Sequence, residues 1–590
     1  MKVVIIGGVA CGAKTAARLS RVCPEAEITL LERGSDLSYA NCGFPFHIGG
    51  EVRDRTGLTH MGFGPARDVE YFERYAFTNA LTGHVVTSID RKKKQVAVRV
   101  VADGTTKVLP WDKLVIATGA SPIRLDVPGM GARGGLGNVF NLWTLRDTIA
   151  ICEALEREKP KKAVVVGAGL VGVETAEALR GRGLDVTLID ALPHPLAALV
   201  GTEFGTMLRT QLAKNGVSFY GGERLTALEG GERARKVVTD KRAIEADIVI
   251  VAAGVRPNIE LARDAKLRIG TRAIRVDRFM RTSDPDIYAG GDCVESRNIL
   301  TGKPVWQPMG STANRHGRVI ADHIAGLARP GARGTFTGST FTGVEGTAIA
   351  RVFDWSVGKT GLTSEAAREA GFAPVEVLAS NPDLPGFMPG VATFFIRLVA
   401  DASTRRVLGA QMTGPGRLDK RLDVIATAIM GKLTVDHLAD VDLAYAPPFS
   451  SALDPVTHAA NALRNKMEGL MPGYSPVELR AKAERGDDFV ILDVRGEKEL
   501  ERFGKLSFDK NNKTNKSISA KAPRKFRHIP LGELKDRVAE LPRDREIIVV
   551  CRAGVRAWSA CSMLRRCGYT KFAVLEGGMA AWPYEVVPHP

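Results

Sequence analysis

Two copies of one local pattern constrain the fold of this 590-residue chain more than any other feature. Each copy is a β-branched strand, a glycine turn, an Ala-rich helical stretch and a second strand that ends in an acid. The first copy runs from Val3 to Glu32, and the second from Ala163 to Asp190. Strands that alternate with helices in this way build parallel sheets covered on both faces. The repeat therefore predicts an α/β protein with two Rossmann-like nucleotide-binding domains.

The second glycine turn, residues 167–172, reads G-A-G-L-V-G and is a complete G-x-G-x-x-G. Backbone N–H groups in such a turn approach a pyrophosphate, and the acid after the next strand accepts the ribose hydroxyls. No cation directly follows that acid to meet a 2′-phosphate, so we expect NADH in preference to NADPH. The residues expected to hold it are Gly167, Gly169, Gly172 and Asp190.

The first glycine turn, residues 7–12, reads G-G-V-A-C-G, so that Val9 stands where the middle glycine is expected. Two nucleotide sites in one chain indicate a flavin that accepts hydride from a nicotinamide. With Thr118-Gly119 after one strand and Gly290-Gly291-Asp292 after another, residues 1 to about 455 resemble the flavin-dependent pyridine nucleotide-disulfide oxidoreductases. The resemblance implies an FAD site, with Asp292 bonded to the ribityl chain. Its expected residues are Gly7, Val9, Gly12, Glu32, Thr118, Gly119 and Asp292.

A single cysteine, Cys42, follows one loop after the first acid, in the stretch S-Y-A-N-C-G-F-P at residues 38–45. In the glutathione-reductase branch of the family, two cysteines at C-x4-C spacing form an internal disulfide, but here the second position is His47. A lone thiol must therefore pair with an external group: a substrate thiol, a sulfane sulfur, or oxygen as a sulfenic acid. We expect Cys42 to be catalytic.

The stretch at 38–45, together with 310–315, 346–349 and 445–452, resembles the coenzyme A disulfide reductases. The resemblance implies a homodimer in which Tyr445 reaches the partner subunit's site, Ser38 and Asn41 flank the substrate sulfur, and two arginines meet the coenzyme A phosphates. An ordinary solvated helix face is the alternative for those arginines. The substrate-binding residues implied there are Arg18, Arg21, Ser38, Asn41, Asn314 and Tyr445.

Two positions depart from that family and leave coenzyme A open as the natural substrate. Phe387-Met388 stands where the family has Tyr-Tyr, which removes hydroxyls that could protonate a leaving thiolate. Leu453 stands where the family has a lysine, which removes one cation for a phosphate.

A second cysteine, Cys551, lies between an expected buried strand and an Ala-rich helix. Such a loop surrounds the sulfur with N–H groups, and two arginines add positive charge. A tyrosine-phosphatase loop is excluded because its arginine position is Ala557. With I-L-D-V-R at 491–495 and L-E-G-G-M-A-A-W at 575–582, the tail resembles a rhodanese domain. The resemblance implies a persulfide on Cys551, steadied by Arg552 and Arg556.

The formal net charge of +16 is concentrated, because residues 505–527 hold eight basic side chains against one acid. That stretch has no apolar period, so we expect a solvated disordered insert and no nucleic-acid partner. Eight cysteines without zinc-ligand spacing predict no metal site. No apolar run reaches the roughly 20 residues that span a bilayer, and no signal peptide is evident, so we expect a cytoplasmic chain without membrane contact.

These observations predict a domain order and a function. The expected parts are an FAD-binding domain (1–150 and 276–330), an NAD(H)-binding domain (151–275), an α+β dimerisation domain (331–455), a linker (456–475) and a rhodanese-like domain (476–590). The expected activity is NADH-dependent reduction of a persulfide, polysulfide or coenzyme A disulfide at Cys42, with Cys551 supplying or relaying sulfane sulfur. An NADH oxidase or peroxidase, and a redox-sensing or sulfur-relay protein with a partner on the insert, are the alternatives.

Overall fold

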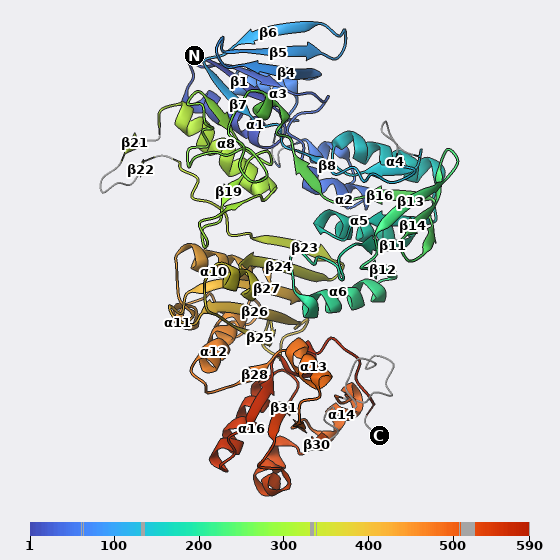
Figure 1. Cartoon of the computed structure of the whole chain (residues 1–590), viewed down its shortest axis with the longest axis vertical. Helices are drawn as coiled ribbons and strands as arrows, with labels where there is room; N and C mark the ends of the chain where they lie inside the picture. The colour runs from blue at the N-terminus through green and yellow to red at the C-terminus, as the bar shows by residue number, and fades with distance from the viewer. Residues whose placement is uncertain are drawn as a thin grey trace. The chain divides into compact units, whose positions relative to one another are not determined.

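The computed structural model describes residues 1–588 except 61, 63, 131–135, 328, 331–335, 338, 507 and 509–525. The chain forms two compact units, and Figure 1 labels their helices and strands. The first unit comprises Met1–Pro193 and Gly216–Val344, and the second comprises His194–Asn215 and Glu345–Pro590. Within the described residues, no helix combines the length and the apolar character that crossing a bilayer demands.

A parallel sheet of five strands forms the core of the first part of unit 1, in the order β18-β7-β1-β2-β3. The central strand is buried from Val3 to Ile6, as expected for a parallel sheet covered on both faces. Helix α1 (Cys11–Val22) links β1 to β2 and packs against α8 (Gly310–Ile324). The strands are β1 (Lys2–Ile6), β2 (Glu27–Leu31), β3 (Thr78–Leu81), β7 (Lys113–Ile116) and β18 (Ile287–Ala289).

A second parallel sheet of unit 1 repeats this arrangement in the order β12-β11-β10-β16-β9. Helix α5 (Leu170–Gly181) links β10 to β11, and α4 (Leu145–Glu158) follows β9. Strand β9 precedes residue 151, where the sequence places the start of the NAD(H)-binding domain, yet it pairs with β16. The strands are β9 (Val139–Asn141), β10 (Lys162–Val166), β11 (Asp185–Asp190), β12 (Val217–Gly221) and β16 (Ile248–Val251).

Shorter elements of unit 1 form antiparallel sheets and connecting helices. One three-stranded sheet contains β4 (His84–Asp90), β5 (Gln95–Val100) and β6 (Thr106–Pro110), and another contains β13 (Leu225–Gly230), β14 (Ala234–Thr239) and β15 (Ala243–Glu245). The strand pairs are β8 (Ala120–Pro122) with β17 (Val255–Pro257), β19 (Ser296–Arg297) with β20 (Pro304–Val305), and β21 (Arg329–Pro330) with β22 (Phe336–Thr337). The remaining helices are α2 (Phe44–Ile48), α3 (Val69–Ala76) and α7 (Glu260–Asp264).

Unit 2 begins with a five-stranded antiparallel sheet in the order β23-β24-β27-β26-β25. Helix α6 (Thr202–Lys214), which comes from the stretch expected to bind NAD(H), belongs to this unit. The strands are β23 (Ala348–Val352), β24 (Trp355–Gly361), β25 (Pro374–Pro382), β26 (Thr393–Asp401) and β27 (Val407–Gly414). The other helices are α9 (Ser364–Glu369), α10 (Asp419–Met430), α11 (Val435–Asp440) and α12 (Pro455–Met467).

Helix α12 occupies most of the stretch 456–475 that the sequence suggests is a linker. It packs against β25 and β26 and buries Val456, Ala459, Ala460 and Leu463 completely. These four residues follow the i, i+3, i+4, i+7 spacing of one helix face. The linker expectation is therefore wrong for residues 456–467, because burial of this apolar face on the sheet stabilises a helix there.

The C-terminal part of unit 2 is a parallel sheet in the order β28-β32-β31-β29-β30. Its strands are β28 (Gly473–Tyr474), β29 (Phe489–Asp493), β30 (Phe526–His528), β31 (Glu546–Val550) and β32 (Phe572–Leu575). Its helices are α13 (Pro476–Arg485), α14 (Glu497–Phe503), α15 (Leu534–Arg537) and α16 (Val555–Arg566). The α/β fold class expected from the sequence is confirmed.

The ends of the basic stretch 505–527 belong to this domain. Leu506 and Phe508 are buried, and the Phe508 ring packs edge-on against Phe489 and Trp582. The far end forms strand β30, which pairs with β29. The expectation of a disordered insert is wrong for these ends because apolar side chains anchor them, whereas 507 and 509–525 lie outside the described residues.

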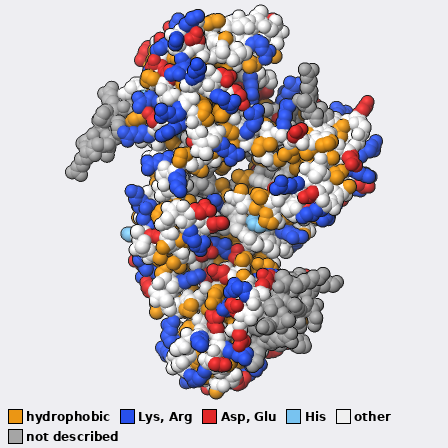
Figure 2. All heavy atoms as spheres, viewed as in Figure 1, with side chains coloured by type: hydrophobic (Ala, Val, Ile, Leu, Met, Phe, Trp, Pro, Cys, Tyr) orange, Lys and Arg blue, Asp and Glu red, His pale blue; other side chains and the backbone are white. Residues whose placement is uncertain are grey.

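On the face drawn in Figure 2, Lys and Arg side chains are interspersed with acidic and apolar ones.

Candidate functional site

The two glycine turns of unit 1 have matching backbone geometry. Gly7 and Gly167 both have a φ of +104°, a conformation that side-chain-bearing residues rarely adopt. A Cβ added to Gly12 or to Gly172 would lie 1.8 Å from the carbonyl oxygen of Gly7 or Gly167, respectively. Each helix therefore starts so close to its strand that only glycine fits at these positions.

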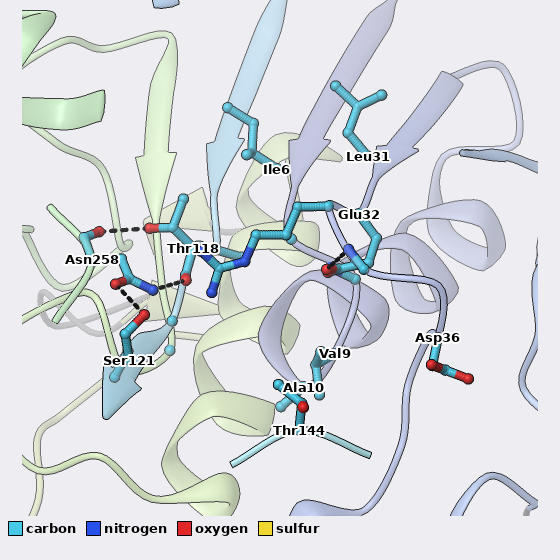
Figure 3. A pocket seen from close by; sticks show the side chains of 18 of the residues that line it. Ile6, Val9, Ala10, Leu31, Glu32, Asp36, Thr118, Ser121, Thr144 and Asn258 are labelled. Carbon is cyan, nitrogen blue, oxygen red and sulfur yellow. Dashed lines mark hydrogen bonds between the residues drawn. The ribbon is translucent and has the colours of Figure 1, made fainter. Parts of the chain in front are cut away.

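The middle position of the turn tolerates a side chain. A Cβ added to Gly169 would meet no atom within 4 Å, so valine at the equivalent position, Val9, causes no clash with the protein. Val9 lines a cavity, beside Ala10 at the start of α1 (Figure 3). Its departure from the G-x-G-x-x-G pattern is thus compatible with the same turn.

The acid after each second strand holds its glycine turn in place. The Glu32 carboxylate accepts hydrogen bonds from the N–H groups of Gly8 and Gly34, both at 2.8 Å. The Asp190 carboxylate accepts one from Ala168 at 2.5 Å and one from Leu192 at 2.7 Å. A carboxylate has about four acceptor positions, so each acid still has capacity for ribose hydroxyls.

A cavity of about 910 Å³ opens along the first glycine turn. This volume falls within the range of roughly 300 to 1,000 Å³ found for cofactor and ligand sites. Its walls bring together the residues that the sequence assigns to FAD from segments far apart in the chain. Those in its lining are Gly7, Val9, Glu32, Thr118, Gly119 and Asp292, whereas Gly12 lies behind them in α1.

One side of this cavity is fixed by Asn258, which the sequence does not single out. The Asn258 Nδ2 donates to the backbone carbonyl of Thr118 at 2.8 Å, and the backbone carbonyl of Asn258 accepts a hydrogen bond from Thr118 Oγ1 at 2.7 Å. Ser121 Oγ donates to Asn258 Oδ1 at 2.8 Å, as the dashed lines in Figure 3 show. These bonds tie the loop after β7 to the loop after β17 and fix Thr118 at the wall.

Asp292 places a carboxyl group at another wall of the cavity. Burial raises its pKa from 3.8 to about 6. The neighbouring N–H of Gly291 donates to Nδ1 of the buried His316 at 3.1 Å, and Trp306 Nε1 donates to the Asp292 carbonyl at 2.8 Å. These bonds fix the backbone on both sides of the carboxyl, which is suited to accept hydrogen bonds from a polyol chain.

Cys42 lies in a short 3₁₀ turn, Asn41–Gly43, with its thiol exposed. The loop before it is attached to the first glycine turn, because the Ser38 N–H donates to the Gly8 carbonyl at 2.9 Å. Ser38 has a φ of +48°, a strained conformation for a serine. Asn41 lines the cavity, whereas Cys42, the next residue in the chain, is exposed and is not part of the lining.

The other residues expected at the coenzyme A site lie on two helices of unit 1 and in a loop of unit 2. Arg18 on α1 forms an ion pair with Asp322 at 2.7 Å, whereas Arg21 is exposed. Asn314 on α8 is exposed, and its Nδ2 donates to the Gly310 carbonyl. Tyr445 belongs to unit 2 and is 54% exposed.

Cys551 lies in the loop between β31 and α16 and is buried. The N–H of Gly554, which has a φ of +106°, donates to its Sγ at 3.1 Å. Backbone donors of this kind stabilise a thiolate. The loop thus directs one backbone N–H at the Cys551 sulfur.

The two arginines of this loop are held by helix α14. Both outer nitrogens of Arg556 donate to the Glu499 carboxylate, at 2.5 and 2.7 Å, and the Arg552 guanidinium lies 3.8 Å from the ring centre of Phe503. Burial lowers the pKa of Arg552. The sequence does not single out Glu499, since nothing local relates it to a loop more than fifty residues away. The helix therefore contributes a carboxylate and an aromatic ring to the surroundings of Cys551.

Family comparisons match the three parts of the chain. Residues 1–313 match the model described as pyridine nucleotide-disulphide oxidoreductase, residues 347–456 match the dimerisation domain of that family, and residues 475–584 match the rhodanese-like domain. A solved structure of an NAD-dependent persulfide reductase from A. fulgidus is 39% identical, with a TM-score of 0.88, and the match covers 99% of this chain and 100% of that one.

Curated relatives match most of the chain. A Pyrococcus horikoshii protein named NAD(P)H coenzyme A polysulfide/persulfide reductase is 35% identical over 465 residues, which cover 78% of this chain and 98% of that protein. A Methanocaldococcus jannaschii protein named NADH oxidase is 31% identical over 467 residues, 79% of this chain and 99% of that protein. The chain belongs to the pyridine nucleotide-disulphide oxidoreductase family and carries, after its nucleotide-binding part, a dimerisation domain and a rhodanese-like domain.

Proposed function

We propose that this protein is an FAD-dependent NADH oxidoreductase that reduces a persulfide, a polysulfide or coenzyme A disulfide at Cys42, and that Cys551 supplies or relays sulfane sulfur. The observation that carries the proposal is the position of Cys42. Its exposed thiol directly follows Asn41, a wall residue of the cavity beside the first glycine turn. The names of the relatives from P. horikoshii and A. fulgidus support this chemistry.

The residues of unit 1 fit two nucleotide cofactors. The first glycine turn, with Glu32, Thr118 and Asp292, would hold FAD in the 910 Å³ cavity, and the second turn, with Asp190, would hold NADH. Both turns are too tight for any residue but glycine at their first and last positions, as a backbone that approaches a pyrophosphate requires. When bound, NADH would supply a hydride and FAD would supply the two electrons that reduce a sulfur–sulfur bond.

Cys42 forms a sulfur–sulfur bond with the substrate, and this bond is then reduced. The Cys42 thiolate attacks the sulfur–sulfur bond of the substrate, forming a new bond to Cys42, and the other sulfur leaves as a thiolate or hydrosulfide that takes up a proton. Two electrons and a proton then cleave the new bond and restore Cys42. Ser38 and Asn41 flank the attacked sulfur, held in place by the Ser38 hydrogen bond to Gly8.

Two arginines on α1 and an asparagine on α8 would bind an anionic carrier of the substrate sulfur. Arg21 is exposed, whereas Arg18 forms an ion pair with Asp322. Asn314 adds a polar group on the adjacent helix. These residues suit the phosphates of coenzyme A or another anionic thiol.

We place the second subunit of a homodimer against an apolar surface of unit 2. Five large side chains of the dimerisation domain are more than half exposed there: Phe387, Met430, Tyr445, Phe449 and Leu453. Where such side chains gather into one exposed patch, that patch marks an interaction surface. Tyr445 is thereby available to a partner subunit.

The eight cysteines, none bonded to another, fit a reducing compartment such as the cytoplasm.

A comparison of electron acceptors tests the proposal. NADH oxidation by the purified protein is measured without oxygen, with a glutathione persulfide, coenzyme A persulfide, polysulfide or coenzyme A disulfide, and separately with oxygen or hydrogen peroxide. The proposal predicts that a sulfur acceptor gives the highest kcat/KM. Oxygen or peroxide as the best acceptor would refute it.

That second outcome defines the alternative function, an NADH oxidase or peroxidase in which Cys42 cycles through a sulfenic acid. The name of the M. jannaschii relative favours it, and a lone thiol without a second cysteine at position 47 is compatible with it. The rhodanese-like domain favours a sulfur acceptor instead, because an oxidase has no use for a sulfur carrier.

A further inference from the structure

A short segment of the rhodanese-like domain, residues 576–580, directly contacts the Cys551 loop. The N–H groups of Met579 and Ala580 donate to the carbonyl oxygens of Cys551 and Arg552, both at 2.9 Å. In a trans peptide the C=O and the following N–H point in opposite directions. Because the carbonyls of Cys551 and Arg552 point toward the segment, the N–H groups of Arg552 and Ala553 point away from it. These two bonds set the orientation of the loop whose N–H at Gly554 donates to the Cys551 sulfur.

The other end of segment 576–580 is fixed to the dimerisation domain. The Glu576 carboxylate is buried, accepts the backbone N–H of Leu378 on β25 at 3.0 Å, and forms an ion pair with Lys466 on α12 at 2.5 Å. Ser380 Oγ, also on β25, donates to the Gly577 carbonyl at 2.7 Å. Three polar contacts thus join this segment to a strand and a helix of another domain.

The packing around the segment leaves little room for independent movement. A Cβ added to Gly577 would lie 3.0 Å from Ser380 Oγ, and one added to Gly578 would lie 2.6 Å from the carbonyl oxygen of Arg552. Both glycines have positive φ angles, +68° and +60°. A shift of the segment at Ser380 is therefore transmitted to the Cys551 loop, because close-packed atoms do not absorb it.

We propose that the dimerisation domain positions the Cys551 loop through segment 576–580, with Lys466 and Ser380 as positioning residues for sulfur transfer. The inference rests on the proposed role of Cys551 as the sulfur carrier. It adds that the carrier site is complete only when the rhodanese-like domain is docked on its own dimerisation domain. Neither positioning residue touches the sulfur.

The test uses thiosulfate as the sulfur donor and cyanide as the acceptor with the full-length protein. The Cys551 thiolate attacks the outer sulfur of thiosulfate, which releases sulfite and leaves a persulfide, and cyanide then removes that sulfur as thiocyanate and restores the thiolate. Alkylation of Cys551 by iodoacetamide, located by mass spectrometry from about pH 5 to about pH 9, separately reports the thiolate fraction.

The variants are Ser380→Ala and the paired change Lys466→Met with Glu576→Gln, which removes both charges of the ion pair together. Because each weakens an anchor of the segment, we expect thiocyanate formation to slow roughly fivefold in Ser380→Ala. The alkylation profile should move to higher pH, and Ser380→Thr, which keeps the hydroxyl, should restore both. NADH-dependent reduction of a redox dye should be unchanged in every variant.

Ser403→Ala is the matched control, since it removes a serine hydrogen bond to Asp401 of the same sheet and does not contact segment 576–580. Wild-type rates and an unshifted alkylation profile in both Ser380→Ala and the paired variant would overturn the inference. If the unaltered protein forms no persulfide on Cys551, the sulfur-carrier role fails instead, and the alkylation profiles still decide whether the segment positions the thiol.

Discussion

Replacing Asp292 with asparagine tests the interpretation of the cavity beside the first glycine turn. The Asp292 carboxyl is at the cavity wall, and burial raises its pKa from 3.8 to about 6. The folded protein therefore binds this proton more tightly than the unfolded chain does. The stability that the proton provides is fully present below pH 3.8 and is lost as the pH rises through about 6.

The size of the effect follows from the two pKa values. Their difference corresponds to about 3 kcal/mol between the protonated and the ionised folded protein. Water in the cavity reduces this value, so about 3 kcal/mol is an upper bound. Because asparagine carries no charge at any pH, we expect Asp292→Asn to be more stable than the unaltered protein at pH 7 and to lose that advantage toward pH 4.

Urea unfolding of the flavin-free protein, followed by circular dichroism at several pH values, measures the difference. Asp36→Asn is the control, since Asp36 lines the same cavity and its carboxylate accepts a hydrogen bond from Ser35. This control should not reproduce the gain at pH 7. Equal stability of Asp292→Asn and the unaltered protein at pH 7, or an advantage that grows toward low pH, would refute the reasoning.

Three further predictions follow from single contacts. Asp401 accepts hydrogen bonds from neighbouring hydroxyl and N–H groups that lower its pKa to about 2. The stability that the ionised carboxylate provides is therefore present above pH 3.8 and is lost as the pH falls through about 2. Asp401→Asn should lower the free energy of unfolding at pH 7, measured in urea, by about 2 kcal/mol. Glu499→Gln removes the carboxylate paired with Arg556, so modification of Cys551 by the anion iodoacetate should accelerate roughly fivefold relative to the neutral iodoacetamide; an unchanged ratio would contradict the pairing. Gly172→Ala would bring a Cβ to 1.8 Å from a carbonyl oxygen, so NADH binding measured by calorimetry should be lost, while retained affinity would argue against a nucleotide at this turn.

The two glycine turns could be predicted because everything that defines them is local. Strand, glycines, helix and acid follow one another within about thirty residues, and the close approach of Gly12 to Gly7 needs no distant segment. The single thiol of Cys42 was equally plain, since the missing partner is a matter of spacing. The geometry of such motifs is determined by the local sequence.

Contacts between distant segments could not be predicted in the same way. Asn258 fixes Thr118 across 140 positions of the chain, and no pattern near either residue indicates the pairing. Strand β9 is only three residues long, Val139–Asn141, and becomes a strand by pairing with β16. Both depend on how the chain folds back on itself.

Helix α12 has only a weak signal in the sequence. Val456, Ala459, Ala460 and Leu463 have the spacing of an apolar helix face, but two of the four are alanines and prolines punctuate the neighbouring sequence. Small side chains give a weak apolar signal, and their burial on a sheet becomes evident only when the sheet is known. The burial of Leu506 and Phe508 was not evident for a different reason, since both lie in a basic stretch without an apolar period.

Anaerobic NADH oxidation with a low-molecular-weight persulfide by the Cys42→Ser variant tests most directly whether electrons leave through this thiol. NADH-dependent reduction of a redox dye, measured in parallel, shows that the nucleotide sites of the variant are intact. The proposed function predicts that persulfide-dependent oxidation falls to the background rate while dye reduction is retained. Undiminished persulfide turnover in Cys42→Ser would contradict it.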